Sequence, residues 1–98
     1  MKPPTSHTSK SVLIVDDNPW IRMVLRERFQ READLAVCGE AENGKEAIEK
    51  AQQLRPELIV LDLSMPVTNG LDAARILRRL MPSMPLIMYS AFADKSLS

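Results

Sequence analysis

Two short, unbroken runs of apolar residues in this chain of 98 residues each stop abruptly at aspartate. Residues 12–15 (VLIV) are followed by Asp16 and Asp17, and residues 58–61 (LIVL) are followed by Asp62. Continuous apolar runs of this length, rich in β-branched side chains, are typical of strands that are covered on both faces, as in a parallel sheet. The sequence therefore predicts two buried parallel strands that carry carboxylates at their carboxyl ends.

Segments with the apolar periodicity of helices separate these strands from two weaker ones. Asn18 is a good N-cap residue and Pro19 a good first helical residue, so a helix is expected directly after the first strand. The apolar positions of the three expected helices are Ile21, Val24, Leu25 and Phe29, then Ala47, Ile48, Ala51 and Leu54, and then Leu71, Ala74, Leu77 and Leu80. An edge strand is expected at residues 35–41 and a last strand at residues 86–89. Strands that alternate with helices in this way indicate an α/β fold, with a parallel sheet between two layers of helices.

Composition excludes some functional classes. The chain has 13 basic and 13 acidic side chains, and this zero net charge argues against direct nucleic-acid binding and against binding to a membrane surface. Residues 1–11 are polar and are expected to be a disordered lead-in without a signal peptide, and no later apolar run reaches transmembrane length. The single cysteine, Cys38, cannot form an internal disulfide and is expected to be a small buried hydrophobe. We therefore expect a cytoplasmic protein with one domain at residues 12–98.

The chemistry of the chain is expected at one edge of the predicted sheet. Parallel strands place Asp16, Asp17 and Asp62 at the same edge, together with Ser90 after the last strand. Carboxylates that lie close together repel one another, and a hard divalent cation such as Mg²⁺, which prefers oxygen ligands, removes the conflict. An aspartate beside Mg²⁺ can act as a nucleophile toward phosphorus and form an aspartyl phosphate. Taken singly, the acidic pair could simply cap a helix and Asp62 could simply form a turn, but together they favour a metal site.

Four stretches of the sequence resemble the receiver domain of bacterial two-component response regulators. They are VLIVDDNPWIR, GEAENGKEAI, PELIVLDLSMPVTNGLDAARILR and PLIMYSA, and they are similar in detail to the subfamily whose receivers precede a helix-turn-helix DNA-binding domain. The resemblance runs from about Val12 to Ala91 and implies a flavodoxin-like (CheY-like) doubly wound parallel sheet of strand order 2-1-3-4-5. This chain would hold the order 2-1-3-4, with the fifth strand and the fifth helix missing.

The resemblance also implies a role for five residues. Asp62 matches the phosphorylated aspartate, Asp17 matches a direct Mg²⁺ ligand, and Asp16 matches an acidic partner that reaches the metal mainly through water. Ser64 would supply its backbone carbonyl to the metal, and its side chain occupies a position that tunes the lifetime of the phosphoryl group. Ser90 matches the switch hydroxyl that turns inward to bond the phosphoryl group.

The sequence departs from this family at its C-terminal end. The family carries a fifth strand that ends in a lysine, followed by a fifth helix, whereas this sequence stops at Ser98, soon after an expected fourth helix begins at Asp94. Without those elements the strand at residues 86–90 becomes an exposed apolar edge, and the first helix loses a neighbour. We therefore expect a homodimer that forms through this edge strand and the uncovered first helix.

Three functions compete for this sequence. The leading hypothesis is a signalling receiver, not a turnover enzyme, that accepts a phosphoryl group on Asp62 from a sensor histidine kinase and controls transcription through an output domain outside this chain. The alternative is a fragment that is impaired in phosphorylation and acts only as a dimerisation module. A Mg²⁺-dependent phosphatase ranks third, because such enzymes usually carry Asp-x-Asp after their first strand, whereas adjacent acids occur here.

Overall fold

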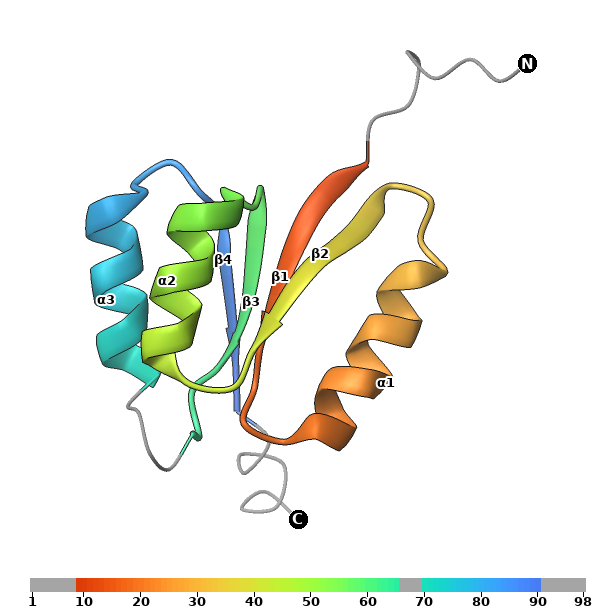
Figure 1. Ribbon diagram of the computed structural model, residues 1–98, viewed down its shortest axis with the longest axis horizontal. Coiled ribbons are helices and arrows are strands. Elements are labelled where there is room, and N and C mark those ends of the chain that lie inside the picture. The colour runs from red at the N-terminus through yellow and green to blue at the C-terminus, as the bar shows by residue number, and fades with distance from the viewer. Residues whose placement is uncertain (1–8, 66–69, 91–98) are drawn as a thin grey trace.

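The computed structural model describes residues 9–65 and 70–90 of the chain (Figure 1). In these residues four strands alternate with three helices, as the apolar pattern predicts. The elements are β1 (Lys10–Val15), α1 (Pro19–Gln30), β2 (Leu35–Ala41), α2 (Gly44–Leu54), β3 (Leu58–Asp62), α3 (Gly70–Leu80) and β4 (Leu86–Tyr89). Residues 1–8 of the expected lead-in and the helix expected at Asp94 lie outside the described residues.

β1 begins earlier than its apolar run. Lys10 and Ser11, which the sequence analysis places in a disordered lead-in, pair with Leu35 and Ala36 of β2. The backbone amide of Lys10 also donates to the carbonyl of Asp34 at 2.8 Å. Strand pairing uses backbone groups and does not require apolar side chains, so the apolar pattern alone places the start of this strand too late.

The four strands form one parallel sheet in the order β2-β1-β3-β4, which confirms the predicted order. Figure 1 shows α2 and α3 on one face of the sheet and α1 on the other. Because crossover connections are right-handed, the reversal of direction after β2 places the later helices on the opposite face from α1. Val12 lies opposite Leu58 and Val15 lies opposite Leu61. This register brings the carboxyl ends of β1 and β3 level with each other.

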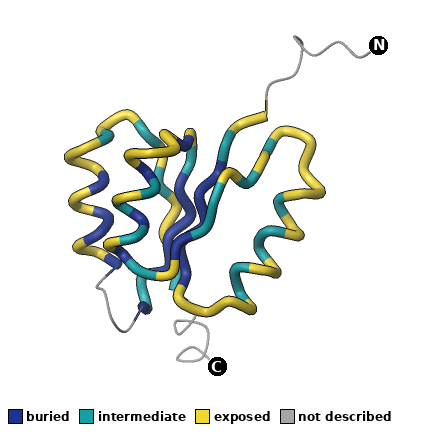
Figure 2. Tube along the Cα trace, in the orientation of Figure 1, coloured by how far each residue is buried: buried dark blue, intermediate teal, exposed yellow. Residues whose placement is uncertain are grey.

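Burial is concentrated in the two central strands and on the inner sides of α2 and α3 (Figure 2). The core on this face contains Leu13, Val15, Ile59, Leu61 and Leu77, together with the small residues Ala41, Ala47, Ala51 and Ala74. The alanines allow the two helices to approach the sheet closely, and the larger side chains fill the space between them. Burial of each branched side chain contributes about 1.5–3 kcal/mol to stability, so this face supplies the main support for the sheet.

The opposite face has a thinner cover, which α1 alone supplies among the described elements. Val12, Ile14 and Val60 form its buried centre, but no residue of α1 is itself buried. Val24 of α1 is 44% exposed and Ile87 of β4 is 52% exposed. In the described part of the chain no strand pairs with the outer edge of β4. The exposed edge strand and the thinly covered first helix that the sequence predicts are therefore both present.

Asparagine side chains fix the points at which α1 and α2 begin. The side-chain oxygen of Asn18 accepts a hydrogen bond from the amide of Trp20 at 2.8 Å, and Pro19 is the first residue of α1, as predicted. Asn43 caps α2 in the same way, through the amide of Glu46 at 2.8 Å. Each cap stabilises its helix by ~1 kcal/mol, and the first cap sets the loop that carries the acidic pair.

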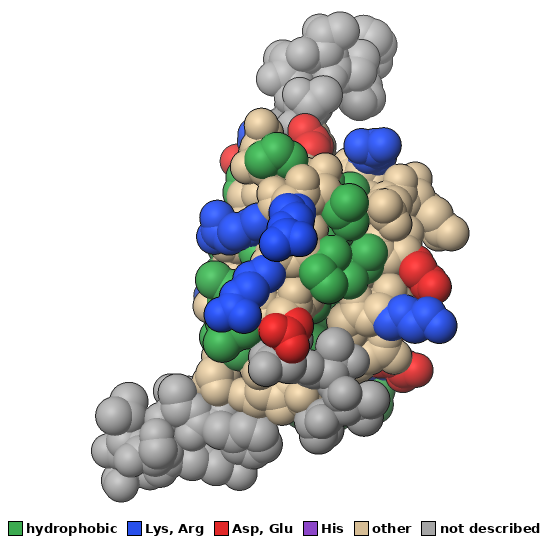
Figure 3. Space-filling model, turned by 90° about the vertical axis from the view of Figure 1, so that its left-hand side faces the viewer, with side chains coloured by type: hydrophobic (Ala, Val, Ile, Leu, Met, Phe, Trp, Pro, Cys, Tyr) green, Lys and Arg blue, Asp and Glu red, His purple; other side chains and the backbone are tan. Residues whose placement is uncertain are grey.

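The outer helix α3 is amphipathic. Its arginines, Arg75, Arg78 and Arg79, are exposed, and Figure 3, which views the molecule from the side of α3, shows basic side chains spread among apolar ones. This mixture of exposed basic and apolar side chains is typical of a solvated helix face. Among the residues described, no helix combines the length and the apolar character needed to cross a bilayer.

Cys38 is exposed, so the prediction that it is a buried hydrophobe is wrong. Val12 pairs with Val37, but the next pair along the strands is Leu13 with Gly39. Cys38 is therefore the extra residue of a β-bulge and lacks a partner on β1. Burial along β2 alternates from Leu35 to Cys38, so Cys38 lies on the exposed side of this edge strand, and the bulge shifts the register only for the residues after it.

Candidate metal centre

Three carboxylates meet at the carboxyl edge of the sheet. Asp16 and Asp17 follow β1, and Asp62 is the last residue of β3. One carboxylate oxygen of each residue lies within 4.8 Å of the corresponding oxygens of the other two. Asp16 and Asp62 are buried, at 1% and 4% exposed, whereas Asp17 is exposed. The structure thus brings together the three acidic side chains that the sequence places at this edge.

The chemistry of this cluster suits a hard divalent cation. All three side chains offer carboxylate oxygens, which are the ligands that Mg²⁺ prefers in proteins. Two of the carboxylates are buried, and buried negative charges that lie this close together are unfavourable unless a positive charge compensates them. Asp16, Asp17 and Asp62 are therefore the side chains that would hold Mg²⁺. The contribution of the backbone carbonyl of Ser64 stays a prediction.

Asp62 is harder to ionise than an ordinary aspartate. Burial is the main cause of its raised pKa, and the negative charges of Asp16 and Asp17 raise the pKa further. Hydrogen bonds from Ser64 act in the opposite direction, since they favour the carboxylate, and its amide lies 2.9 Å from Oδ1 of Asp62. A cation held by the cluster would favour the ionised form of Asp62, which is the form that can act as a nucleophile.

Ser90 follows β4 directly and lies beside the loop that comes after Asp62. The hydroxyl oxygens of Ser64 and Ser90 are 2.6 Å apart, in a hydrogen bond that either hydroxyl can donate. Close to this pair, the amide of Leu63 donates to the carbonyl of Tyr89 at 2.8 Å. The structure thus brings the two predicted serines into contact, and the ends of the adjacent strands β3 and β4 hold them there.

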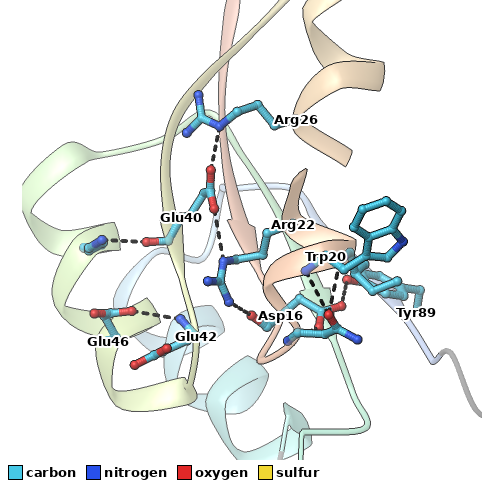
Figure 4. Close-up of polar contacts among 11 residues, drawn as sticks. Asp16, Trp20, Arg22, Arg26, Glu40, Glu42, Glu46 and Tyr89 are labelled. Carbon is cyan, nitrogen blue, oxygen red and sulfur yellow. Dashed lines mark hydrogen bonds and ion pairs between the residues drawn. The ribbon is translucent and has the colours of Figure 1, made fainter. Parts of the chain in front are cut away.

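Tyr89 also reaches into the site, although the sequence analysis did not single it out. It is the last residue of β4, it pairs with Asp62 of β3, and its hydroxyl donates to Oδ2 of Asp16 (Figure 4). Burial is the main cause of a strongly raised pKa of Tyr89, and the hydrogen bond to Asp16 raises this pKa further, so the phenol stays a donor. The signal that could have found this residue is its position: it ends a strand at the edge where the acidic residues gather.

A second polar network braces the backbone next to the site (Figure 4). Arg22 of α1 donates through Nη1 to the backbone carbonyl of Asp16 at 2.7 Å and through Nε to Glu40 of β2 at 3.0 Å. Arg26, one turn further along α1, donates to the other carboxylate oxygen of Glu40. Burial raises the pKa of Glu40, but the hydrogen bonds and charges of Arg26 and Arg22 outweigh it and hold the pKa below its usual value. This network was not predicted from the sequence, where its one signal is the four-residue spacing of Arg22 and Arg26.

Gly70 occupies a position where the start of α3 meets the end of β3. A Cβ atom at this residue would lie 2.6 Å from the backbone oxygen of Asp62 and 2.7 Å from Cα of Leu63. Both are backbone atoms, which cannot move aside without displacing Asp62 itself. Glycine therefore allows α3 to pack directly against the residue that ends the central strand.

Comparisons with known proteins agree on one kind of domain. Residues 12–98 match a family model described as the response regulator receiver domain. A protein-glutamate methylesterase/protein-glutamine glutaminase of Pyrococcus horikoshii is 45% identical over 84 residues, which cover 86% of this chain and 23% of that protein. The chemotaxis protein CheY of Thermotoga maritima is 39% identical over 88 residues, which cover 90% of this chain and 72% of CheY.

A solved structure gives the same result for the fold. A two-component response regulator of the LuxR family from Aurantimonas sp. superposes with a TM-score of 0.80 at 27% identity, covering 92% of this chain and 68% of that chain. The matched proteins differ in length, and this chain spans less than a quarter of the methylesterase. What they share with this chain is therefore the receiver domain.

Proposed function

The chain belongs to the response regulator receiver domain family, and we propose that it works as a signalling switch whose Asp62 accepts a phosphoryl group. The observation that carries this proposal is the meeting of three carboxylates at one edge of the sheet. Asp62 is the acceptor because it ends the central strand, is buried beside the other two acids and lies next to the bonded pair Ser64 and Ser90.

The other site residues have supporting roles in this proposal. Asp17, which is exposed, would bind Mg²⁺ directly, whereas Asp16, which is buried, would reach the metal mainly through water. Ser64 would add its backbone carbonyl to the metal site. Ser90 is the switch hydroxyl, which exchanges its present contact with Ser64 for one with the phosphoryl group.

In the proposed reaction, a carboxylate oxygen of Asp62 attacks the phosphorus of a phosphohistidine. The new O–P bond replaces the N–P bond, and the released imidazole nitrogen keeps the bonding electron pair and takes up a proton from water. When bound, Mg²⁺ supplies positive charge that offsets the charges of the carboxylates and of the phosphoryl oxygens. The amide of Ser64, which lies 2.9 Å from Oδ1, holds the carboxylate of Asp62 in one orientation during the attack.

The donor in this proposal is a sensor histidine kinase, and the place of work is the cytoplasm. Receiver domains take phosphoryl groups from such kinases, and this chain shares their fold and their acidic edge. We assign the output to transcription, through a domain outside this chain, which the likeness to a LuxR-family regulator supports. The methylesterase of Pyrococcus horikoshii, at 45% identity, supports an enzymatic output domain instead. In either case the receiver itself is a phosphoacceptor and not a turnover enzyme.

A second candidate function is a dimerisation module that is not phosphorylated. The observation that favours it is that apolar side chains of β4 and of α1 are exposed: Ile87 is 52% exposed, Met88 is 39% exposed and Val24 is 44% exposed. Another copy of the chain could pair with the open edge of β4 and cover the apolar side chains there. A dimerisation module would not explain why three carboxylates gather at the carboxyl ends of β1 and β3.

Beryllium fluoride, which mimics a phosphoryl group, separates the two functions when it is added with Mg²⁺. Trp20 is the only tryptophan of the sequence and lies in the first turn of α1, close to the acidic pair. The switch proposal predicts a saturable change in the emission of Trp20 that requires both Mg²⁺ and beryllium fluoride and is absent from Asp62→Asn. An unchanged spectrum in a wild-type protein that circular dichroism shows to be folded contradicts the switch and supports the dimerisation module.

A further inference from the structure

The contact between Tyr89 and Asp16 is not needed for any step of the proposed phosphoryl transfer. Tyr89 ends β4, Asp16 follows β1, and β3 lies between these strands. Because adjacent strands lie about 4.8 Å apart, the side chains of Tyr89 and Asp16 together bridge two strand spacings. The tyrosine ring also packs against the buried cluster of Val12, Ile14 and Val60. The core therefore holds the ring in place while the hydroxyl reaches the acidic site.

The carboxylate of Asp16 has a hydrogen-bond donor on each of its oxygens. Oδ1 accepts from the amide of Asn18 at 2.8 Å, and Oδ2 accepts from the hydroxyl of Tyr89. Asp16 is only 1% exposed, so bulk water has little access to either oxygen. A buried carboxylate that lacks a donor is strongly unfavourable. The phenol of Tyr89 thus offers partial positive charge to a cluster whose carboxylate oxygens have no hydrogen bond from a basic side chain among the residues that the structure describes.

We propose that Tyr89 is a latch on the acidic site: its hydroxyl holds Oδ2 of Asp16 while the site is free of metal, and it releases this oxygen when a divalent cation binds. The inference rests on the proposed function, since it assumes that the same three carboxylates hold Mg²⁺. The hydroxyl competes for the same negative charge with the cation, and also with the water through which Asp16 is proposed to reach the metal. The hydrogen bond lowers the free energy of the metal-free site, and any part of it that is lost on binding subtracts from the metal affinity.

The position of the latch gives it a second consequence. Tyr89 is followed directly by Ser90, and its carbonyl accepts from the amide of Leu63 in the loop after Asp62. Its release therefore changes the contacts of the edge strand at the residue next to the switch hydroxyl. Metal binding therefore changes the contacts of β4, through Tyr89, before any phosphoryl group is transferred.

Calorimetric titration of Mg²⁺ into the full chain tests the latch in the wild type and in Tyr89→Phe. Phenylalanine keeps the ring that packs on the core and removes only the hydroxyl. We expect Tyr89→Phe to bind Mg²⁺ about ten-fold more tightly, since a net hydrogen bond to a charged group is of this size. The control is Ser83→Ala, which removes an exposed hydroxyl before β4. This residue lies at the amino ends of the strands, away from the acidic site, so the Mg²⁺ affinity is expected to stay unchanged.

A second measurement follows the wild-type protein alone. Tyr89 is the only tyrosine of the sequence, so selective ¹³C labelling of tyrosine gives one set of ring signals in the NMR spectrum. The latch predicts that these signals shift during the Mg²⁺ titration, in step with the calorimetric binding curve. This readout needs no variant and stays valid even if Tyr89→Phe folds poorly.

The possible results separate the latch from the function on which it rests. Weaker Mg²⁺ binding by Tyr89→Phe overturns the latch, since the hydroxyl would then orient Asp16 for the metal. Equal affinities with an unmoved tyrosine signal also overturn the latch but leave the receiver proposal standing. Absence of Mg²⁺ binding in both proteins overturns the latch and the proposed function together.

Discussion

At the acidic edge, a buried carboxylate is unfavourable for folding by itself, and only the three carboxylates together could hold a cation. The carboxylate of Asp62 is buried beside two like charges, which raises its pKa. The sequence predicts that Asp16, Asp17 and Asp62 lie together, because each follows an apolar strand of predicted direction, and the structure places their carboxylates within 4.8 Å of one another. The position of Tyr89 at the end of a strand places it at this edge, but its contact with Asp16 depends on how far one side chain reaches across two strand spacings. No local pattern encodes that reach.

Asp62→Asn is expected to stabilise the metal-free protein at pH 7. The neutral amide avoids both the burial of a charge and the repulsion from Asp16 and Asp17, so the free energy of unfolding should rise by on the order of 1 kcal/mol. Urea denaturation in the presence of a chelator measures this change. Saturating Mg²⁺ should reverse the order of the two proteins, because only the wild type keeps the complete ligand set.

The raised pKa of Asp62 also fixes how this difference depends on pH. Because the pKa is higher in the folded than in the unfolded protein, the contribution of Asp62 favours folding at low pH and is lost as the pH rises through the folded pKa. The advantage of Asp62→Asn in metal-free buffer should therefore shrink as the pH falls from neutral toward about 4, the ordinary pKa of aspartate. An advantage that grows toward low pH would contradict this explanation.

At the scale of helices and strands, close contacts between helices and strand ends hold the acidic site in place. The strands and helices themselves follow from the sequence, because continuous apolar runs predict buried parallel strands and periodic ones predict helices. The bulge at Cys38 and the brace formed by Arg22 and Glu40 do not follow from it. Both depend on the register between neighbouring elements, which is set by tertiary packing.

Gly70→Ala is expected to destabilise the protein by about 2–3 kcal/mol, because its new Cβ would meet backbone atoms of Asp62 and Leu63. The matched control is Gly39→Ala, whose Cβ would lie 2.8 Å from Cδ1 of Leu54, the far end of a flexible and exposed side chain. That side chain can turn away, so Gly39→Ala should cost less than ~1 kcal/mol. Urea denaturation of both variants gives the comparison. Equal losses of stability in the two variants would show that the start of α3 does not pack tightly against the end of β3.

The whole molecule has one well-covered face and one thin face. The strand order that sets this arrangement could be predicted from the resemblance to receiver domains, and the structure confirms it. The chemistry of the acidic site does not explain why the side chains at the exposed edge of β4 are apolar. An open edge with an exposed apolar side chain such as Ile87, together with the exposed Val24 on α1, favours association with another chain.

The protein is expected to form a homodimer through the edge of β4 and the surface of α1. Sedimentation equilibrium should show a concentration-dependent dimer for the wild type and a monomer for Ile87→Lys, because a buried lysine opposes edge pairing. The control is Ile76→Lys on α3, a residue that is 44% exposed on the opposite face of the sheet, and it should leave the dimer intact. A wild-type protein that stays monomeric at all concentrations would contradict this expectation.

Intact-mass spectrometry after incubation with acetyl phosphate tests most directly whether the shared acidic edge makes Asp62 reactive toward phosphorus. We predict that the wild-type chain gains the mass of one phosphoryl group when Mg²⁺ is present. No gain is expected when a chelator removes the metal, nor in Asp62→Asn with Mg²⁺. An equal gain in the chelated protein or in the variant would contradict the role of the three carboxylates, and so would a wild-type chain that binds Mg²⁺ but gains no mass.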